Sequence, residues 1–383
     1  MNNLIIDCET TCLKIPEEIN GYAMIKSNRL ILLGMMNDRG DEVVYNFDTL
    51  EPITPIIKSI QYHIDRVDQL VFFNAKFDLH WLRRIGIRYE HKKIYDCQIV
   101  HYLTHSQTRF PSLNEVAMEY NLGEKIDVIK NKYWSMNIDT DAIPKKELTE
   151  YLIQDLKLTK DIYHLQKLPE DMVNLNYLMS LDTMALIEIE SNGMKYDTIN
   201  SLQEGDKLIE ENKKLVSEFI DLVGFAKVNI QSGDHLSAIL YGGNITLEHK
   251  EPIGEYKTGA KKGQVRNKIV KTNYVFPRLV TPPKGSELKK EGFYSTDINT
   301  LQSLKGNKKV KRIIELLLEI SERNKMINTY LHGIPVMINK YDWDGYVHGQ
   351  FNQTSAVTGR LSSTKPNLQN IDKSLCYLFT SRY

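Results

Sequence analysis

The first part of the chain alternates short apolar runs with segments of helical periodicity. Runs rich in β-branched and apolar residues predict strands at residues 4–7, 29–36, 42–47 and 69–73. Apolar residues that recur every three or four positions predict helices at residues 77–85, 96–103, 113–120 and about 145–166. Strands followed by helices are typical of an α/β domain with a mixed sheet, which we expect over residues 1–168.

The pattern changes after Leu168 and Pro169. Long helical periods with many charged residues predict helices at residues 170–192, 198–222, 297–304 and 308–328. We therefore expect a mainly helical domain over residues 169–338, interrupted at about 248–291 by a basic insertion resembling a β-hairpin. Residues 339–383 have little periodicity and are rich in Ser, Thr, Asn and Gln, so we treat them as a third segment.

The charge of the chain is balanced overall but uneven locally. Lys and Arg together number 49, as do Asp and Glu, which argues against a protein that coats nucleic acid nonspecifically. Residues 256–284 contain eight basic residues and no acidic one. We expect several of them to contact DNA phosphates, and the open alternative is a solvated hairpin whose charges serve solubility. The residues concerned are Lys257, Lys261, Lys262, Arg266, Lys268 and Lys271.

Several sequence features indicate in which cellular compartment the protein is found. No stretch approaches the roughly 18 consecutive apolar residues of a membrane helix. The acidic N-terminus lacks the basic region of a signal peptide. The four cysteines (Cys8, Cys12, Cys97 and Cys376) have neither the paired spacing of a zinc site nor the density of a disulfide scaffold. We expect reduced thiols, a cytoplasmic location and no membrane partner.

Four carboxylates and a tyrosine stand at positions suited to metal-dependent chemistry. Asp7 and Glu9 lie two apart in a predicted strand, so both point to one face and offer oxygen ligands to a divalent cation. Asp78 begins a predicted helix, where the alternative role is that of an N-cap. Tyr151 and Asp155 are four apart and share one helical face, although any amphipathic helix can carry such a pair.

The order of these motifs decides between the alternatives. DxET, then NxxFD, then YxxxD resembles the tyrosine variant of the DEDD exonuclease superfamily. The resemblance implies an RNase H-like fold and two Mg²⁺ or Mn²⁺ ions. Asp7 would bridge both ions, Glu9 and Asp155 would complete the ligands of one, and Asp78 would support the other. Tyr151 would orient the attacking water, so the activity implied is 3′→5′ exonucleolytic hydrolysis.

The rest of the chain resembles family A (DNA polymerase I-like) DNA polymerases. The segment VHGQFNQTSAVTGRLSSTKPNLQNI, residues 347–371, is similar to the first part of the palm, and YSTDINTLQSL and NKMINTYLHGIP are similar to thumb segments. Amide and guanidinium donors suit the minor groove, where every base pair presents an acceptor. The resemblance implies contacts with primer–template DNA by Arg360, Asn367, Gln369, Asn370, Lys325 and Thr329.

We therefore expect the proofreading exonuclease and primer–template-gripping portion of a family A polymerase, of phage origin. The later palm motifs do not occur in these 383 residues, so we expect no polymerisation by this chain alone. A truncated chain or a split gene with a second polypeptide would explain this, and would leave Leu375, Tyr377, Leu378 and Phe379 exposed. Two alternatives stay open: an RNase D-type exonuclease that trims RNA or DNA, and a non-catalytic DNA-binding subunit. The substrates expected are primer–template DNA and single-stranded 3′ ends.

Overall fold

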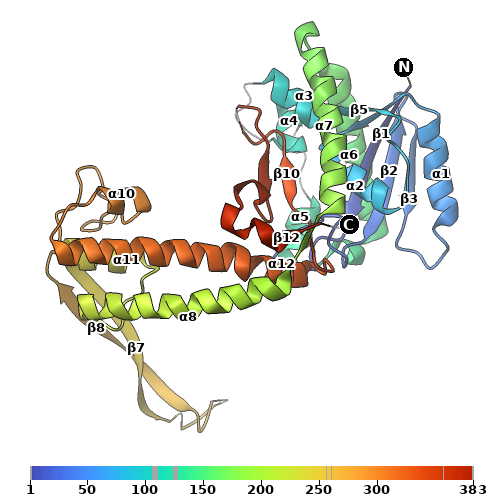
Figure 1. Ribbon diagram of the computed structural model, residues 1–383. Helices are drawn as coiled ribbons and strands as arrows, with labels where there is room; N and C mark the ends of the chain where they lie inside the picture. Colours follow the sequence, from blue (N-terminus) through green and yellow to red (C-terminus); the bar gives the residue numbers. More distant parts are fainter. Residues whose placement is uncertain are drawn as a thin grey trace. The chain divides into compact units, whose positions relative to one another are not determined.

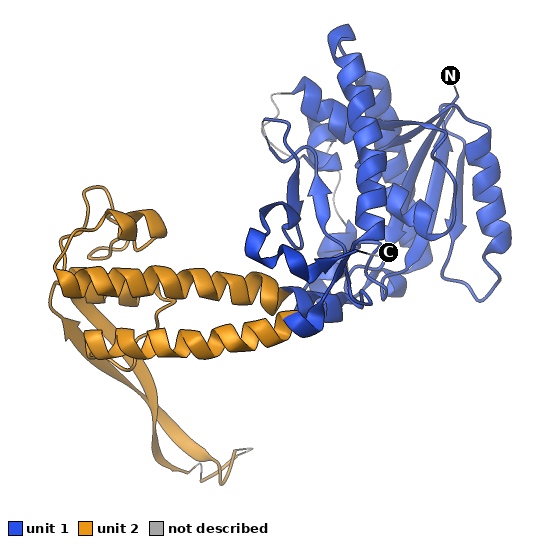
Figure 2. Cartoon of the chain, in the orientation of Figure 1, with its two compact units in different colours: residues 1–200, 334–383 blue, residues 201–333 orange. Residues whose placement is uncertain are grey.

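The structure is a computed structural model that describes residues 2–105, 111–123, 128–255, 257–259, 261–356 and 358–381. The chain forms two compact units (Figure 2). The first contains residues 1–200 and 334–383, and the second contains residues 201–333. Among the described residues, no helix has both the length and the apolar character needed to cross a membrane.

A five-stranded sheet forms the centre of the first unit (Figure 1). Its strands run in the order β3-β2-β1-β4-β5 and are β1 (Asn3–Thr10), β2 (Leu30–Asn37), β3 (Glu42–Asn46), β4 (Gln69–Phe72) and β5 (Lys93–Asp96). Strands β1, β2 and β3 pair antiparallel, whereas β4 is parallel to both β1 and β5. The predicted mixed sheet is confirmed, and β5 is a strand that the sequence analysis did not predict.

Helices cover both faces of this sheet. On one face α1 (Thr54–Asp65) and α2 (Ala75–Arg84) pack against Ile6 and the other side chains of that face of β1. On the other face α6 (Lys145–Leu165) packs its Leu152 and Leu156 against Ile5. Because β1 is covered on both faces, its apolar residues run on without alternating with polar ones. The other helices before residue 170 are α3 (Cys97–Thr104), α4 (Leu113–Glu119), α5 (Val128–Lys132) and the 3₁₀ turns Trp134–Met136 and Thr140–Ala142.

The compact units do not follow the predicted domain limits at residues 168 and 338. Helix α7 (Val173–Asn192) belongs to the first unit, because it buries Ile187 in the core beneath α2 and donates a hydrogen bond from Ser180 to the Ile94 carbonyl at 3.1 Å. A 3₁₀ turn, Glu170–Met172, precedes it. The predicted helix at residues 170–192 is thus present but packs with the α/β part of the chain.

The C-terminal segment packs into the first unit through short strands. Strand β6 (Met194–Tyr196) lies between β9 (Tyr346–Val347) and β12 (Phe379–Thr380), and β10 (Gln350–Asn352) pairs with β11 (Ser362–Thr364). The 3₁₀ turns Leu368–Asn370 and Lys373–Leu378 complete it.

The expectation that this end is exposed is wrong for two of its four residues. Leu375 is 5% exposed and Leu378 is 0% exposed. The Leu378 carbonyl accepts a hydrogen bond from the Asp197 amide at 2.9 Å, and Phe379 pairs with Tyr196. Tyr377, at 57%, is exposed as predicted.

Two long helices form the frame of the second unit. They are α8 (Thr198–Val223) and α11 (Lys308–Lys325), with α11 continuing into a π-helical segment, Met326–Leu331, before α12 (Gly333–Tyr341). Ion pairs between Glu218 and Arg312 at 2.7 Å and between Glu211 and Arg323 at 3.1 Å show that α8 and α11 run antiparallel. Their facing sides bury Phe219 against α11. The short helices α9 (Gly233–Tyr241) and α10 (Ile298–Ser303) pack beside them.

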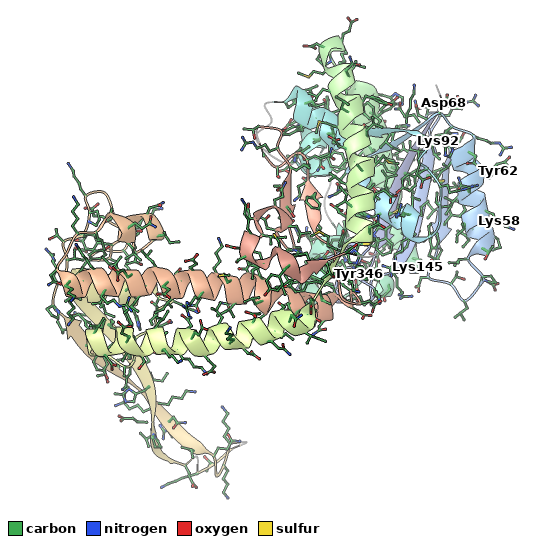
Figure 3. All side chains as sticks on the ribbon, in the orientation of Figure 1. Lys58, Tyr62, Asp68, Lys92, Lys145 and Tyr346 are labelled. Carbon is green, nitrogen blue, oxygen red and sulfur yellow. The ribbon has the colours of Figure 1, made fainter. Side chains whose placement is uncertain are left out.

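The predicted hairpin is confirmed in the second unit. Strands β7 (Gly243–Glu255) and β8 (Val265–Phe276) pair antiparallel over most of their length, and their side chains project from both faces of the ribbon (Figure 3). The base of the hairpin has a core, in which Ile245 packs beside Phe225 and Tyr274, whereas most of the described residues farther along both strands are exposed. The outer part is therefore held mainly by its own ladder of hydrogen bonds, which by itself gives marginal stability.

Candidate active site

Strand β1 carries the first two carboxylates of the site. Asp7 and Glu9 alternate with Cys8, so they share the face of β1 that also presents Ile5 to α6. Asp7 is partly buried and Glu9 is 7% exposed. The strand thus places two carboxylates side by side at the end of a buried apolar run, where few water molecules can screen them from one another.

A glycine on the neighbouring strand lets α6 approach this position closely. Asp7 lies opposite Gly34 in the β1–β2 register. A Cβ atom on Gly34 would lie 2.7 Å from Leu156 Cδ1 and 3.0 Å from Leu152 Cγ. Because such contacts are too short for a side chain, only glycine allows α6 to pack this tightly on β2. Asp155, which directly precedes Leu156, is thereby brought to the carboxylates of β1.

Three carboxylates consequently form one cluster. The ligand oxygens of Asp7, Glu9 and Asp155 all lie within 4.8 Å of one another, and Asp155 is 8% exposed. Tyr151 is one helical turn before Asp155 on α6. An all-oxygen set of closely spaced carboxylates suits the hard cations Mg²⁺ and Mn²⁺. The sequence thus predicted three residues that the fold brings together from two elements.

The fourth carboxylate, Asp78, comes from α2 and is 1% exposed. Burial, followed by the charges of Asp7 and Asp96, raises the pKa of Asp78 well above its ordinary value. Its Oδ1 atom is buried and has no hydrogen-bond partner among the described residues. Asp78 is not part of the three-residue cluster, but its carboxyl lies close enough to Asp7 for the charge of Asp7 to act on it. A buried carboxylate oxygen without a partner near a second carboxylate fits a site completed by cations. The N-cap of α2 is Asn74, so the alternative that Asp78 caps this helix is wrong.

Asp96 fixes the start of the helix that carries Asp78. Its carboxylate accepts hydrogen bonds from the backbone N–H groups of Asn74 at 3.0 Å, Ala75 at 2.7 Å and Gln98 at 2.8 Å. One buried side chain therefore satisfies N–H groups at the beginning of both α2 and α3. The sequence analysis did not assign this role, although an aspartate directly before a helix is a signal for it.

The residues expected to contact primer–template DNA lie in both units. Arg360, Asn367, Gln369 and Asn370 are exposed in the C-terminal segment. Their turn is held from inside by the nearly buried Ser363, whose hydroxyl accepts a hydrogen bond from the Leu368 amide at 3.1 Å. The Asn367 side chain accepts a hydrogen bond from the Gln369 amide at 3.1 Å, so its carbonyl oxygen already has a local role.

Lys325 and Thr329 lie on the second unit. Both are exposed, four positions apart, where α11 passes into the π-helical segment. Lys325 lines an open pocket with apolar lining residues, such as Leu317, and with polar side chains that include Gln231, Thr296 and Asn324. These polar residues offer several hydrogen-bond donors next to one positive charge. Such groups are typical of surfaces that contact the phosphates of DNA.

The hairpin is less basic than its sequence suggests. The register of β7 and β8 places Glu248 opposite Lys271 and Glu251 opposite Lys268, and the first pair forms an ion pair of 2.8 Å. The acidic residues lie outside the basic stretch in sequence but beside it in the sheet. Uncompensated positive charge is therefore concentrated near the exposed Lys261 and Lys262, in the connection between the strands.

Known proteins resemble most of the chain and, separately, a part near its C-terminal end. Residues 272–377 match the family described as "DNA polymerase family A". The DNA polymerase of Bacillus phage SP01 is 23% identical over 386 residues, covering 93% of this chain and 40% of that protein. The thermostable DNA polymerase I of Thermus filiformis is 40% identical over 97 residues, covering 25% of this chain and 11% of that protein.

A solved structure has the same fold. It is the POL domain of Pol1 from M. smegmatis in complex with DNA primer–template and dNTP, with a TM-score of 0.64, 19% identity, and coverage of 97% of this chain and 52% of that chain. The chain is thus similar to the family A DNA polymerases, and its residues 272–377 match that family as the C-terminal motifs predicted. It spans between 11% and 40% of the length of the two curated relatives described above.

Proposed function

We propose that this chain is the 3′→5′ exonuclease and primer–template-gripping portion of a family A DNA polymerase. The observation that carries the proposal is the cluster of Asp7, Glu9 and Asp155, whose ligand oxygens lie within 4.8 Å of one another. The buried Asp78 lies close enough to Asp7 for the charge of Asp7 to raise its pKa. The likeness to a polymerase domain that was solved with DNA supports a DNA substrate. The exonuclease domain, thumb and first palm segment would correspond to residues 1–168, 169–338 and 339–383.

The residues of the cluster have distinct tasks in this proposal. Asp7, Glu9, Asp78 and Asp155 would hold two divalent ions, Mg²⁺ or Mn²⁺, which supply charge stabilisation for in-line displacement at a phosphodiester. Tyr151 would orient the water that attacks the terminal phosphodiester. The carboxylates are held by β1, α2 and α6 rather than by loops, so the site is preorganised and little reorganisation is needed during reaction.

The direct test is degradation of labelled DNA. We expect the purified chain to shorten a 5′-labelled single strand stepwise from its 3′ end with Mg²⁺ present, and we expect EDTA to stop the reaction. A matched RNA strand should be degraded more slowly. Equal rates on RNA and DNA would favour an RNase D-type enzyme instead. Failure to cleave either strand with Mg²⁺ or Mn²⁺ would refute the exonuclease assignment and leave a DNA-binding subunit.

A second test concerns the basic end of the hairpin. Neutralising Z phosphates gives a slope near −0.9Z in a plot of log K against log salt for duplex DNA. Replacing Lys261 and Lys262 by alanine should therefore flatten the slope for primer–template binding by up to about two units. The control replaces two exposed lysines of the first unit, Lys58 and Lys146, and should leave the slope unchanged. An unchanged slope in the hairpin variant would favour a role in solubility.

A further inference from the structure

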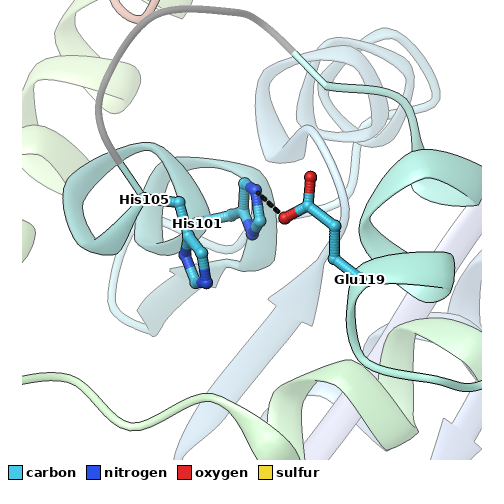
Figure 4. A group of neighbouring side chains, drawn as sticks. All are labelled: His101, His105 and Glu119. Atoms are coloured by element: carbon cyan, nitrogen blue, oxygen red, sulfur yellow. Dashed lines mark ion pairs between the residues drawn. The ribbon is translucent and has the colours of Figure 1, made fainter.

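A second group of possible metal ligands lies outside the carboxylate cluster. His101 and His105 are one helical turn apart at the end of α3, and Glu119 is the last residue of α4 (Figure 4). Their ligand atoms all lie within 4.8 Å of one another. His101 Nε2 is 3.2 Å from a carboxylate oxygen of Glu119. The sequence analysis did not single out this group, although the HxxxH spacing of the two histidines was visible.

Two further observations describe the surroundings of His101. His101 is 4% exposed, and its Nδ1 atom is buried without a partner in the described part of the chain. In addition, the His105 ring stacks on the His101 ring with a centroid distance of 4.1 Å. Two imidazoles this close disfavour protonation of each other, and burial, followed by the nearby His105, lowers the pKa of His101. Neutral imidazole is the form that ligates metals.

The distance between His101 and Glu119 fits a transition-metal site, and His105 can join it after its ring rotates. Zinc bound by nitrogen and oxygen at about 2.0–2.1 Å in a tetrahedron has ligands about 3.3 Å apart. The 3.2 Å separation of His101 Nε2 and the Glu119 oxygen matches one such edge. His105 is exposed at the end of α3, and its Nδ1 lies 2.8 Å from Thr104 Oγ1, so its Nε2 atom is the one suited to ligation. Because stacked rings cannot both aim at one ion, the exposed His105 ring has to rotate on binding.

We propose that His101, His105 and Glu119 bind one Zn²⁺ ion, with solvent completing its coordination. Two imidazoles and one carboxylate favour Zn²⁺ over Mg²⁺, whereas the all-oxygen cluster of Asp7, Glu9 and Asp155 has the opposite preference. The ion would tie the end of α3 to the end of α4. Its role is structural, because it links the ends of two helices that also share a hydrophobic core cluster through Cys97 of α3 and Val116 of α4.

The test separates this site from the carboxylate cluster. The chain of residues 1–383 carrying Asp7→Ala and Glu9→Ala, which remove two ligands of the carboxylate cluster, is used throughout. Zn²⁺ binding is measured by titration calorimetry, and Co²⁺ binding is followed by visible absorption. We expect about one equivalent of Zn²⁺ and the intense Co²⁺ bands of a site of low coordination number. Adding His105→Ala should weaken Zn²⁺ binding at least about tenfold, since changes even in the outer shell of metal sites cost about that much. It should also abolish the rise in melting temperature with Zn²⁺.

The control is His164→Ala, which removes an exposed histidine that lies 3.7 Å from Asp38 on the same unit. This variant should bind Zn²⁺ like its parent. Far-ultraviolet circular dichroism checks that His105→Ala is folded, which its exposed position favours. Absence of Zn²⁺ binding in the Asp7→Ala/Glu9→Ala chain, or equal binding with and without His105, would overturn the proposal. Neither result bears on the exonuclease activity.

Discussion

Replacement of both Asp7 and Glu9 by alanine is expected to lower Mg²⁺-dependent 3′ nucleotide release at least about a thousandfold. The two side chains supply two of the three carboxylates whose oxygens lie within 4.8 Å of one another. Metal ions contribute several kcal/mol of transition-state stabilisation, and each 1.36 kcal/mol is a factor of about ten in rate. The measurement is single-turnover release of nucleotide from a 5′-labelled strand.

DNA binding by this double variant should stay close to that of the parent, because the residues expected to grip DNA lie elsewhere. Removing two mutually repelling charges should leave the melting temperature unchanged or slightly higher. The matched control is Asp41→Ala with Glu42→Ala, two exposed acids beside one another at the β2–β3 turn. Tyr151→Phe should cause a smaller loss, since it removes a hydroxyl but no ligand. Substantial Mg²⁺-dependent cleavage by the double variant would rule out this active site.

The second large effect is expected at Glu190, where Glu190→Gln should lower the free energy of unfolding of the first unit by about 3–5 kcal/mol. The Glu190 carboxylate is fully buried. It accepts hydrogen bonds from Lys76 Nζ, from the Phe351 amide and from His80 Nε2, each at 2.6 Å. The variant would leave the Lys76 ammonium without its counter-charge. This side chain connects α7 to α2, which carries Asp78, and to strand β10.

Urea unfolding monitored by tryptophan fluorescence is the appropriate measurement. All three tryptophans (Trp81, Trp134 and Trp343) lie in the first unit, so the signal reports that unit alone. The control is Glu188→Gln, which removes an exposed partner of Arg83 and should cost no more than about 1 kcal/mol. If Glu190→Gln lowered the free energy of unfolding by less than about 1 kcal/mol, the proposal that Glu190 stabilises the packing of α7 with α2 and β10 would be wrong.

Acid should lower the stability of the unsubstituted protein through protonation of His80 and Glu190. Burial is the main cause that lowers the pKa of His80 below its ordinary 6.5, so the folded protein holds this ring neutral. Burial alone would raise the pKa of Glu190, but the hydrogen bond from His80 and the charge of Lys76 lower it below 4.5. Both groups then bind fewer protons in the folded than in the unfolded chain. Stability should therefore fall as the pH drops below about 6.5, and fall further below about 4.5.

Periodicity and motif order allowed much of the molecule to be predicted. The four strand runs correspond to β1–β4, and the long helical periods correspond to α6, α7, α8 and α11, because buried strands and long amphipathic helices leave strong local patterns. Strand β5 was missed because its sequence, KIYD, begins and ends with charged residues, whereas β4, which is equally short, is buried at all four positions. The candidate residues Asp7, Glu9, Asp78, Tyr151 and Asp155 could be named because their spacing in sequence resembles a family, not because their contacts could be calculated.

The sequence alone determined which residues are candidates for the chemistry and which of the longer segments form strands or helices. Only the tertiary structure decided which of them meet. Gly34 is one glycine among 21 in the sequence, yet its missing side chain allows α6 to approach β1. In the hairpin, acidic residues of β7 lie opposite basic residues of β8. Leu378 is buried next to the paired strands β12 and β6. Contacts between residues far apart in the chain depend on how whole elements pack, and local sequence carries no record of that packing.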